Sequence, residues 1–108
     1  MADASVPVLV ITGPIGVGKT TVTQSIGQVL TEAGVPHAAI DMDWLRNSWP
    51  QPAGDRFNTR VGFRNLAAVA ANYREAGSDR FVIADVVEAW LDRESYQRAI
   101  PGAEVSVV

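Results

Sequence analysis

The feature that most constrains this chain is a loop of eight residues rich in glycine. The loop matches the pattern G-x-x-x-x-G-K-[ST] at every position, and its residues are Gly13, Pro14, Ile15, Gly16, Val17, Gly18, Lys19 and Thr20. The continuous apolar run Val6–Thr12 comes directly before the loop and is typical of a strand buried on both faces. Because an amphipathic segment follows, the order of strand, loop and helix indicates a phosphate-binding loop rather than a chance glycine-rich turn.

The binding of a phosphate group requires these residue types at this spacing. The three glycines of the loop allow backbone conformations that other residues avoid, so that N–H groups can turn inward around an anion. A helix that begins at Lys19 adds the positive end of its dipole. We expect Lys19 to contact the β- and γ-phosphates and Thr20 to bind Mg²⁺, while Thr21 borders the nucleotide or caps the helix locally. The predicted ligands are therefore ATP and Mg²⁺.

Composition excludes several other classes of function. The chain has no cysteine, so disulfides, thiolate metal sites and thiol nucleophiles are excluded. A net charge of −3 argues against binding nucleic acid through bulk charge. The apolar run Val6–Ile11 is too short to span a membrane and has no basic flank of the kind a signal peptide carries. We therefore expect a cytoplasmic protein that binds neither nucleic acid nor membranes.

The alternation of strand-like and helix-like segments predicts one α/β domain over residues 1–108, with a parallel sheet and crossover helices. Strands are expected at Val6–Thr12, Ala38–Asp41, Phe81–Val87 and Glu104–Val108. Helices are expected at Lys19–Ala33, Thr59–Ala76 and Asp92–Ile100, with an irregular loop or short helix at Trp44–Asn58. The residues expected to face the sheet are Val22, Ile26, Val29, Leu30 and Ala33 in the first helix and Phe63, Leu66, Ala67, Ala70 and Tyr73 in the second. We expect the last strand to leave an exposed edge through which the chain can self-associate.

Carboxylates follow two of the predicted strands. Asp41 and Asp43 follow the second strand, and Asp85 ends the apolar run Phe81–Ala84 in the form of a Walker-B strand. Parallel α/β sheets bind ligands at the carboxyl ends of their strands, so these side chains are candidates for a functional site. We expect Asp85 to hold Mg²⁺ through water, opposite Thr20. The alternative for all three is a structural carboxylate that caps the following turn.

These landmarks together resemble the small P-loop kinases similar to nucleoside monophosphate kinases, including adenylylsulfate kinase, gluconate kinase and chloramphenicol phosphotransferase. Asp41-Met42-Asp43-Trp44-Leu45-Arg46 is similar to the D-G-D-x-x-R stretch of adenylylsulfate kinase, with Met42 in place of glycine. The resemblance implies a three-layer P-loop NTPase fold. It also implies that Asp43, or Asp41, orients or deprotonates the acceptor hydroxyl, and that Arg46 holds an anionic part of the acceptor. Arg64 is implied as a further anion ligand, because its helix flanks the acceptor site in similar kinases.

The expected function is transfer of the γ-phosphate of Mg-ATP to a hydroxyl of a small molecule, with Lys19 and Asp43 as the central residues. Two alternatives remain open: a nucleotide-binding switch or regulatory ATPase, and an inactive, truncated nucleotide-binding fragment. Similar kinases continue past the fourth strand with an arginine-bearing lid and a fifth strand, so the domain is expected to be incomplete at its C-terminus. The sequence has no N-K-x-D motif of a GTPase. It does not identify the acceptor.

Overall fold

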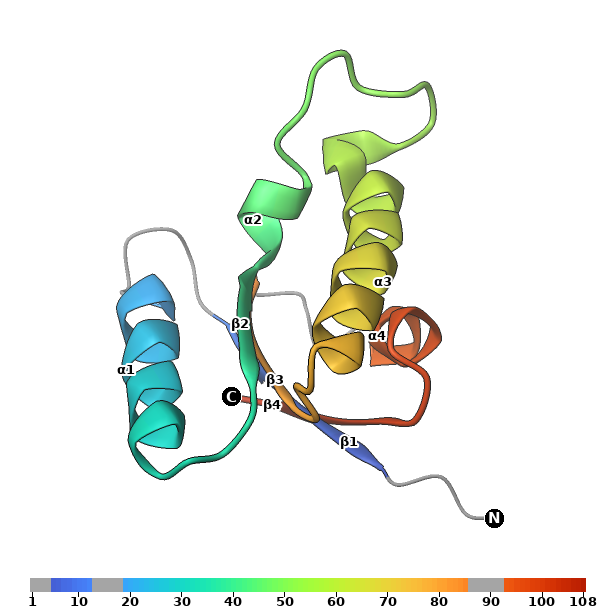
Figure 1. Cartoon of the computed structure of the whole chain (residues 1–108). Helices are drawn as coiled ribbons and strands as arrows, with labels where there is room; N and C mark the ends of the chain where they lie inside the picture. Colours follow the sequence, from blue (N-terminus) through green and yellow to red (C-terminus); the bar gives the residue numbers. More distant parts are fainter. Residues whose placement is uncertain (1–4, 13–18, 86–92) are drawn as a thin grey trace.

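The computed structural model describes residues 5–12, 19–85 and 93–108, and these form a sheet covered by helices (Figure 1). The sheet has four parallel strands in the order β2-β3-β1-β4. The strands are β1 (Val6–Ile11), β2 (Ala38–Asp41), β3 (Phe81–Ala84) and β4 (Ala103–Val107). The parallel sheet expected from the sequence is therefore confirmed, and β4 lies at an edge of the described sheet.

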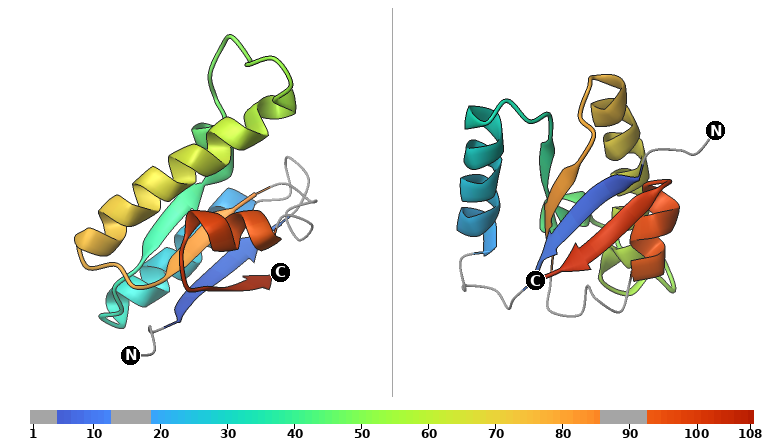
Figure 2. Two further views of the ribbon diagram at one scale, coloured as in Figure 1. Left: turned by 90° about the vertical axis from the view of Figure 1, so that its right-hand side faces the viewer. Right: turned by 90° about the horizontal axis from the view of Figure 1, so that it is seen from below.

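Helices cover both faces of this sheet, which makes the three layers of the predicted α/β fold (Figures 1 and 2). One face carries α1, and the opposite face carries α3 and α4. The helices are α1 (Lys19–Glu32), α2 (Met42–Leu45), α3 (Thr59–Glu75) and α4 (Arg93–Ala99), with a 3₁₀ turn η1 at Arg56–Asn58. None of the helices described here is both long and apolar enough to cross a membrane.

The main core lies between the sheet and the helices α3 and α4. Phe81 and Ile83 from β3 pack there with Leu66 from α3, Tyr96 from α4 and Ile100 directly after α4, and all five are buried. Burying an apolar side chain of this size contributes about 1.5–3 kcal/mol, so these contacts orient α3 and α4 on the sheet.

The first helix packs with a different face from the one its apolar stripe predicts. Val22 and Val29 are 45% and 62% exposed, whereas Thr23 and Gly27 are buried. Gly27 lies on the sheet side, where a Cβ atom would come within 3.5 Å of Nε2 of His37. The expectation for Val22 and Val29 was wrong because α1 turns the side that carries Thr23 and Gly27 toward the sheet, rather than its apolar stripe.

The predicted ends of the helices agree with the structure more closely than the predicted face of α1 does. Gly34 adopts a φ of +71°, and the N–H of Val35 donates to the carbonyl of Leu30 at 2.9 Å, as expected of a glycine that ends a helix. Gly77 similarly follows α3 with a φ of +114°. Tyr73, expected to face the sheet, is exposed instead, because it lies in the last turn of α3.

The parallel register brings the carboxyl ends of three strands to the same edge of the sheet. Ala84 is the register partner of both Ile11 and Asp41. The N–H of Asp85 continues the ladder by donating to the carbonyl of Ile11 at 3.0 Å. The residues that follow β1, β2 and β3 are therefore placed next to one another, as ligand sites in open α/β sheets require.

Candidate functional site

The carboxylates that follow β2 and β3 meet at this edge of the sheet, and Arg46 lies between them. The carboxylate of Asp41 ends β2 and caps α2 by accepting the N–H of Asp43 at 2.9 Å. The single turn of α2 then leads to Arg46. This residue ends the helix, and its N–H donates a hydrogen bond to the carbonyl of Met42. Asp43 and Arg46 therefore lie one helical turn apart, and Arg46 can also reach β3.

Arg46 joins two carboxylates that are distant in the sequence. Its Nη2 donates to Oδ1 of Asp43 and to Oδ1 of Asp85, each at 2.8 Å. The Arg46 side chain is 13% exposed and that of Asp85 only 2%, whereas the Asp43 side chain is 46% exposed. Burial lowers the pKa of Arg46, but hydrogen bonds and charge pairing with Asp85 and then Asp43 outweigh it and raise that pKa above its ordinary value. Arg46 therefore stays charged and donates hydrogen bonds to two carboxylates, Asp43 in α2 and Asp85 after β3.

Tyr96 completes this group from the opposite side. Its hydroxyl donates to Oδ2 of Asp85, and its ring meets Phe63 edge-on at 5.0 Å between centroids. Tyr96 is not among the site residues predicted from the sequence. Its spacing of four from Ile100, within the predicted helix Asp92–Ile100, was a usable signal, because a tyrosine on the buried face of a helix needs a polar partner for its hydroxyl.

The loop between α2 and α3 is held in place by Asn58. Its Nδ2 donates to the carbonyls of Arg46 and Ser48, each at 2.9 Å, and its backbone is left-handed, with a φ of 56°. Asparagine tolerates that conformation better than most residues. Its buried Oδ1 has no hydrogen-bond partner in the described part of the chain. Asn58 was expected only as the end of an irregular loop, yet it positions the backbone of Arg46.

Gly62 on α3 leaves room for the stem of Arg46. A Cβ atom at this position would lie 2.5 Å from Cγ and 3.3 Å from Cδ of Arg46. Gly62→Ala should therefore displace the arginine from Asp85 and lower the free energy of unfolding by about 1–3 kcal/mol, although alanine favours helix. Chemical denaturation would measure this effect.

Gly27→Ala provides a matched control for that substitution, because Gly27 also lies inside a helix. A Cβ atom at Gly27 would lie 3.5 Å from Nε2 of His37, which is an ordinary van der Waals contact. Alanine there should be neutral or stabilising by up to about 1 kcal/mol. Equal stability changes in the two variants would contradict the role of Gly62.

The phosphate-loop residues predicted from the sequence fall largely outside the described part of the chain. Gly13, Pro14, Ile15, Gly16, Val17 and Gly18 lie outside the described residues, and so do the side chains of Lys19 and Thr20. Lys19 and Thr20 do begin α1, as predicted, and Thr21 follows them as an exposed residue.

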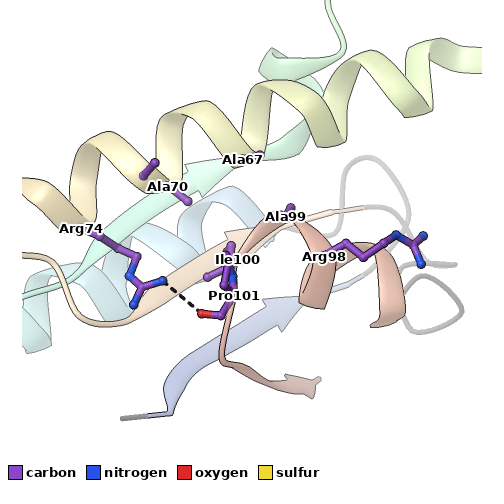
Figure 3. Close-up of a pocket in the computed structure, with 8 residues that line it drawn as sticks. Ala67, Ala70, Arg74, Arg98, Ala99, Ile100 and Pro101 are labelled. Carbon is purple, nitrogen blue, oxygen red and sulfur yellow. Dashed lines mark hydrogen bonds between the residues drawn. The ribbon is translucent and has the colours of Figure 1, made fainter. Parts of the chain in front are cut away.

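Arg64 lies on the outer side of α3. With Arg60 and Phe63 it lines a hollow of about 400 Å³ that α4 borders through Arg98. A neighbouring hollow of about 490 Å³ continues along α3 and α4, and there Arg74 donates to the carbonyl of Pro101 at 3.1 Å (Figure 3). Neither Asp43 nor Asp85, the two carboxylates that Arg46 contacts, lines either of these hollows. The role of Arg64 as an anion ligand stays a prediction.

Comparison with known proteins gives a family and a fold. The family model for adenylylsulphate kinase matches residues 5–107. A solved structure titled "Crystal structure of APE1195" superimposes with a TM-score of 0.59 and 24% sequence identity, over 95% of this chain and 59% of that one. The chain thus spans 59% of the length of this structural neighbour, whose similarity supports the fold. No curated protein matches the sequence significantly.

Proposed function

Since this chain belongs to the adenylylsulphate kinase family of nucleotide-binding P-loop kinases, we propose that it transfers the γ-phosphate of Mg-ATP to a hydroxyl of a small molecule. The observation that carries the proposal is the half-exposed carboxylate of Asp43 at the carboxyl edge of the sheet, held by Arg46 at 2.8 Å. Phosphoryl transfer requires mainly positioning and charge neutralisation, with one carboxylate beside the attacking hydroxyl.

The nucleotide would be held by residues around the start of α1. The amides of residues 13–18 and the ammonium of Lys19 would hold its phosphates, and a compact ammonium suits this position better than a guanidinium. Lys19 is the only lysine in the chain, beside eight arginines. Bound Mg²⁺ would neutralise charge on the β- and γ-phosphates.

The oxygen groups at this edge fit a magnesium ion that is bound largely by phosphates and water. The donors would be the hydroxyl of Thr20 and the carboxylate of Asp85, both of the hard oxygen type that Mg²⁺ prefers. Both oxygens of Asp85 already accept hydrogen bonds from Arg46 and Tyr96, so this carboxylate fits contact through water better than direct ligation.

Of the two candidate carboxylates, Asp43 suits the acceptor hydroxyl better. Asp41 uses its carboxylate to cap α2, where Oδ1 accepts the N–H of Asp43. The carboxylate of Asp43 accepts a hydrogen bond from Arg46, and its side chain remains half-exposed. Asp43 would orient the hydroxyl and accept its proton, and Asp41 would fix the turn that presents it.

Asp43→Asn should lower the rate of phosphate transfer by about 10²–10⁴, the usual contribution of a positioned acid or base, while binding of Mg-ATP changes little. The measurement is transfer of label from γ-labelled ATP to a panel of hydroxyl compounds, with nucleotide binding followed by calorimetry. Asp79→Asn is the matched control, because Asp79 is an exposed carboxylate that precedes β3 at the opposite end of the strand.

Two results would contradict the proposal. If Asp43→Asn lowers transfer no more than Asp79→Asn does, Asp43 is not the carboxylate at the acceptor. If the label appears only as inorganic phosphate for every compound, the protein is a nucleotide-hydrolysing switch rather than a kinase.

A further inference from the structure

A groove runs between the two helices that cover one face of the sheet (Figure 3). It consists of the hollows of about 400 Å³ and 490 Å³ described above, which adjoin because Ala67, Arg98 and Ala99 line both. Together they extend from Thr59, the first residue of α3, to Arg74 in its last turn. At 1.5 Å per residue this is about 22 Å, or about four turns of helix. We call this surface the α3–α4 groove, and its length suits a segment of a protein chain.

The α3–α4 groove combines an apolar floor with a basic rim. The buried or partly buried residues that line it are Phe63, Ala67, Ala70, Ala99 and Ile100, and Thr59 and Ser95 lie beside them. Half of the eight arginines of the chain line it as exposed residues: Arg60, Arg64, Arg74 and Arg98. Among the described residues, none that lines the groove is acidic. A chain with a net charge of −3 therefore has one strongly basic surface.

The arginines of this rim are available to a ligand. Within the described part of the chain, the guanidinium groups of Arg60 and Arg64 make no hydrogen bond or ion pair. Arg98 contacts Glu94 at 3.8 Å, but both side chains are largely exposed, and Arg74 donates only to a backbone carbonyl at 3.1 Å. Because exposed pairs of this kind contribute little, carboxylates of a ligand could approach the rim without breaking a strong contact.

The spacing of residues along α3 indicates that the ligand is itself a helix. Steps of four, three, four and three residues separate five groove residues that are exposed or partly exposed: Arg60, Arg64, Ala67, Ala71 and Arg74. Alternating steps of four and three place side chains in one seam, along which two helices pack. Alanine at the centre of the seam allows the axis of a second helix to come close.

Charge distinguishes between the possible helical and non-helical ligands. A two-fold dimer of this chain through the α3–α4 groove would place the basic surface against itself, and like charges would repel. A nucleic acid would match the charge of the rim, but its phosphate backbone offers no apolar face to the floor, and the net charge of −3 opposes it. An acidic amphipathic helix matches both the floor and the rim.

We propose that the α3–α4 groove binds an amphipathic helix of another protein. One face of that helix carries small or aliphatic residues, which pack on the alanine floor, and aspartate or glutamate flanks this face and pairs with the arginines. Neither Asp43 nor Asp85 lines the groove, so this binding is separate from the proposed phosphate transfer and does not depend on it.

A display library of helical peptides tests the proposal, with the 108-residue chain as bait. The peptides have about 18 residues, enough to span the groove, with a fixed face of leucine and alanine and randomised flanking positions. The selected peptides should carry aspartate or glutamate on the flanks. Exchanging these residues for lysine should weaken binding at least about tenfold in fluorescence anisotropy, because attraction to the arginines becomes repulsion.

Ala71→Glu tests whether the selected peptides bind in the groove. The new carboxylate would stand in the α3 seam and repel an acidic helix, so binding should weaken at least about tenfold. Ala68→Glu is the matched control, because Ala68 is also an exposed alanine of α3 but lines neither hollow. Glutamate favours helix, so both variants should fold.

A second pair of variants tests the arginines at constant net charge. Arg60→Gln combined with Arg64→Gln should weaken binding of the selected peptides about threefold to tenfold. Arg56→Gln combined with Arg80→Gln removes the same charge outside the groove and should change binding by less than about twofold.

Several results would overturn the proposal. These are a selection that yields no binder or only binders with basic or uncharged flanks, equal binding to Ala71→Glu and Ala68→Glu, and tighter binding of a short RNA duplex than of any selected peptide. Self-association in sedimentation that Ala71→Glu abolishes and Ala68→Glu does not would also overturn it, because the groove would then join copies of this chain. Transfer of label from γ-labelled ATP is measured separately, so the proposed kinase function stands or fails by itself.

Discussion

Replacing Lys19 with alanine is expected to abolish the thermal stabilisation that Mg-ATP gives to this protein. A ligand at about 100 times its dissociation constant stabilises the native state by about 2.7 kcal/mol, which is several degrees in the unfolding temperature of a domain of this size. Lys19 is predicted to contribute the ammonium that meets the β- and γ-phosphates, so its loss should reduce that shift to near zero. Thermal unfolding with and without Mg-ATP measures the effect.

The control for Lys19→Ala removes a cation elsewhere. Arg98→Ala deletes an exposed side chain on α4 whose contact with Glu94 spans 3.8 Å at the surface. It should leave the stabilisation by Mg-ATP intact, because a surface contact of this kind contributes little. If the Lys19→Ala protein is stabilised by Mg-ATP as strongly as the unaltered protein, the phosphate-loop assignment is wrong.

Arg46→Met is expected to destabilise the fold by about 3–5 kcal/mol, because it removes the cationic partner of a buried carboxylate. Asp85 is 2% exposed, and Arg46 pairs with it at 2.8 Å. Methionine preserves most of the length of the side chain, so the loss would report charge pairing more than packing. Urea denaturation provides the measurement.

Two further variants make this second test specific. Arg80→Met removes an arginine whose ion pair with Asp79 is partly exposed and 3.3 Å long, and it should cost no more than about 1 kcal/mol. The double variant Arg46→Met with Asp85→Asn should recover part of the loss, because the buried charge is then gone as well. Equal destabilisation by Arg46→Met and Arg80→Met would contradict the claim that the buried Arg46–Asp85 ion pair stabilises the fold more than a surface pair does.

Local patterns in the sequence were sufficient for much of the fold. The strand Ala38–Asp41 was predicted at the bounds it has, and Gly34, directly after the predicted helix Lys19–Ala33, adopts the left-handed backbone of a glycine that ends a helix. Such features depend on contiguous residues and on the steric rules of the backbone, so they can be derived without knowledge of the partners. The face of α1 was predicted wrongly at Val22 and Val29, because the side with Thr23 and Gly27 packs on the sheet, and an apolar stripe does not reveal which side the tertiary packing buries.

The sequence by itself determined the class of fold, the phosphate-loop motif and the carboxylates that end two strands. Each of these is a contiguous pattern with its own physical reason. Only the tertiary structure decided that Arg46 reaches Asp85 across 39 positions, that Tyr96 holds the same carboxylate, and that Gly62 leaves space for the arginine stem. These pairings arise from how the crossover helices pack on the parallel sheet. Spacing along the chain can mark a residue such as Tyr96 as buried, but it does not identify the partner that the residue meets across the fold.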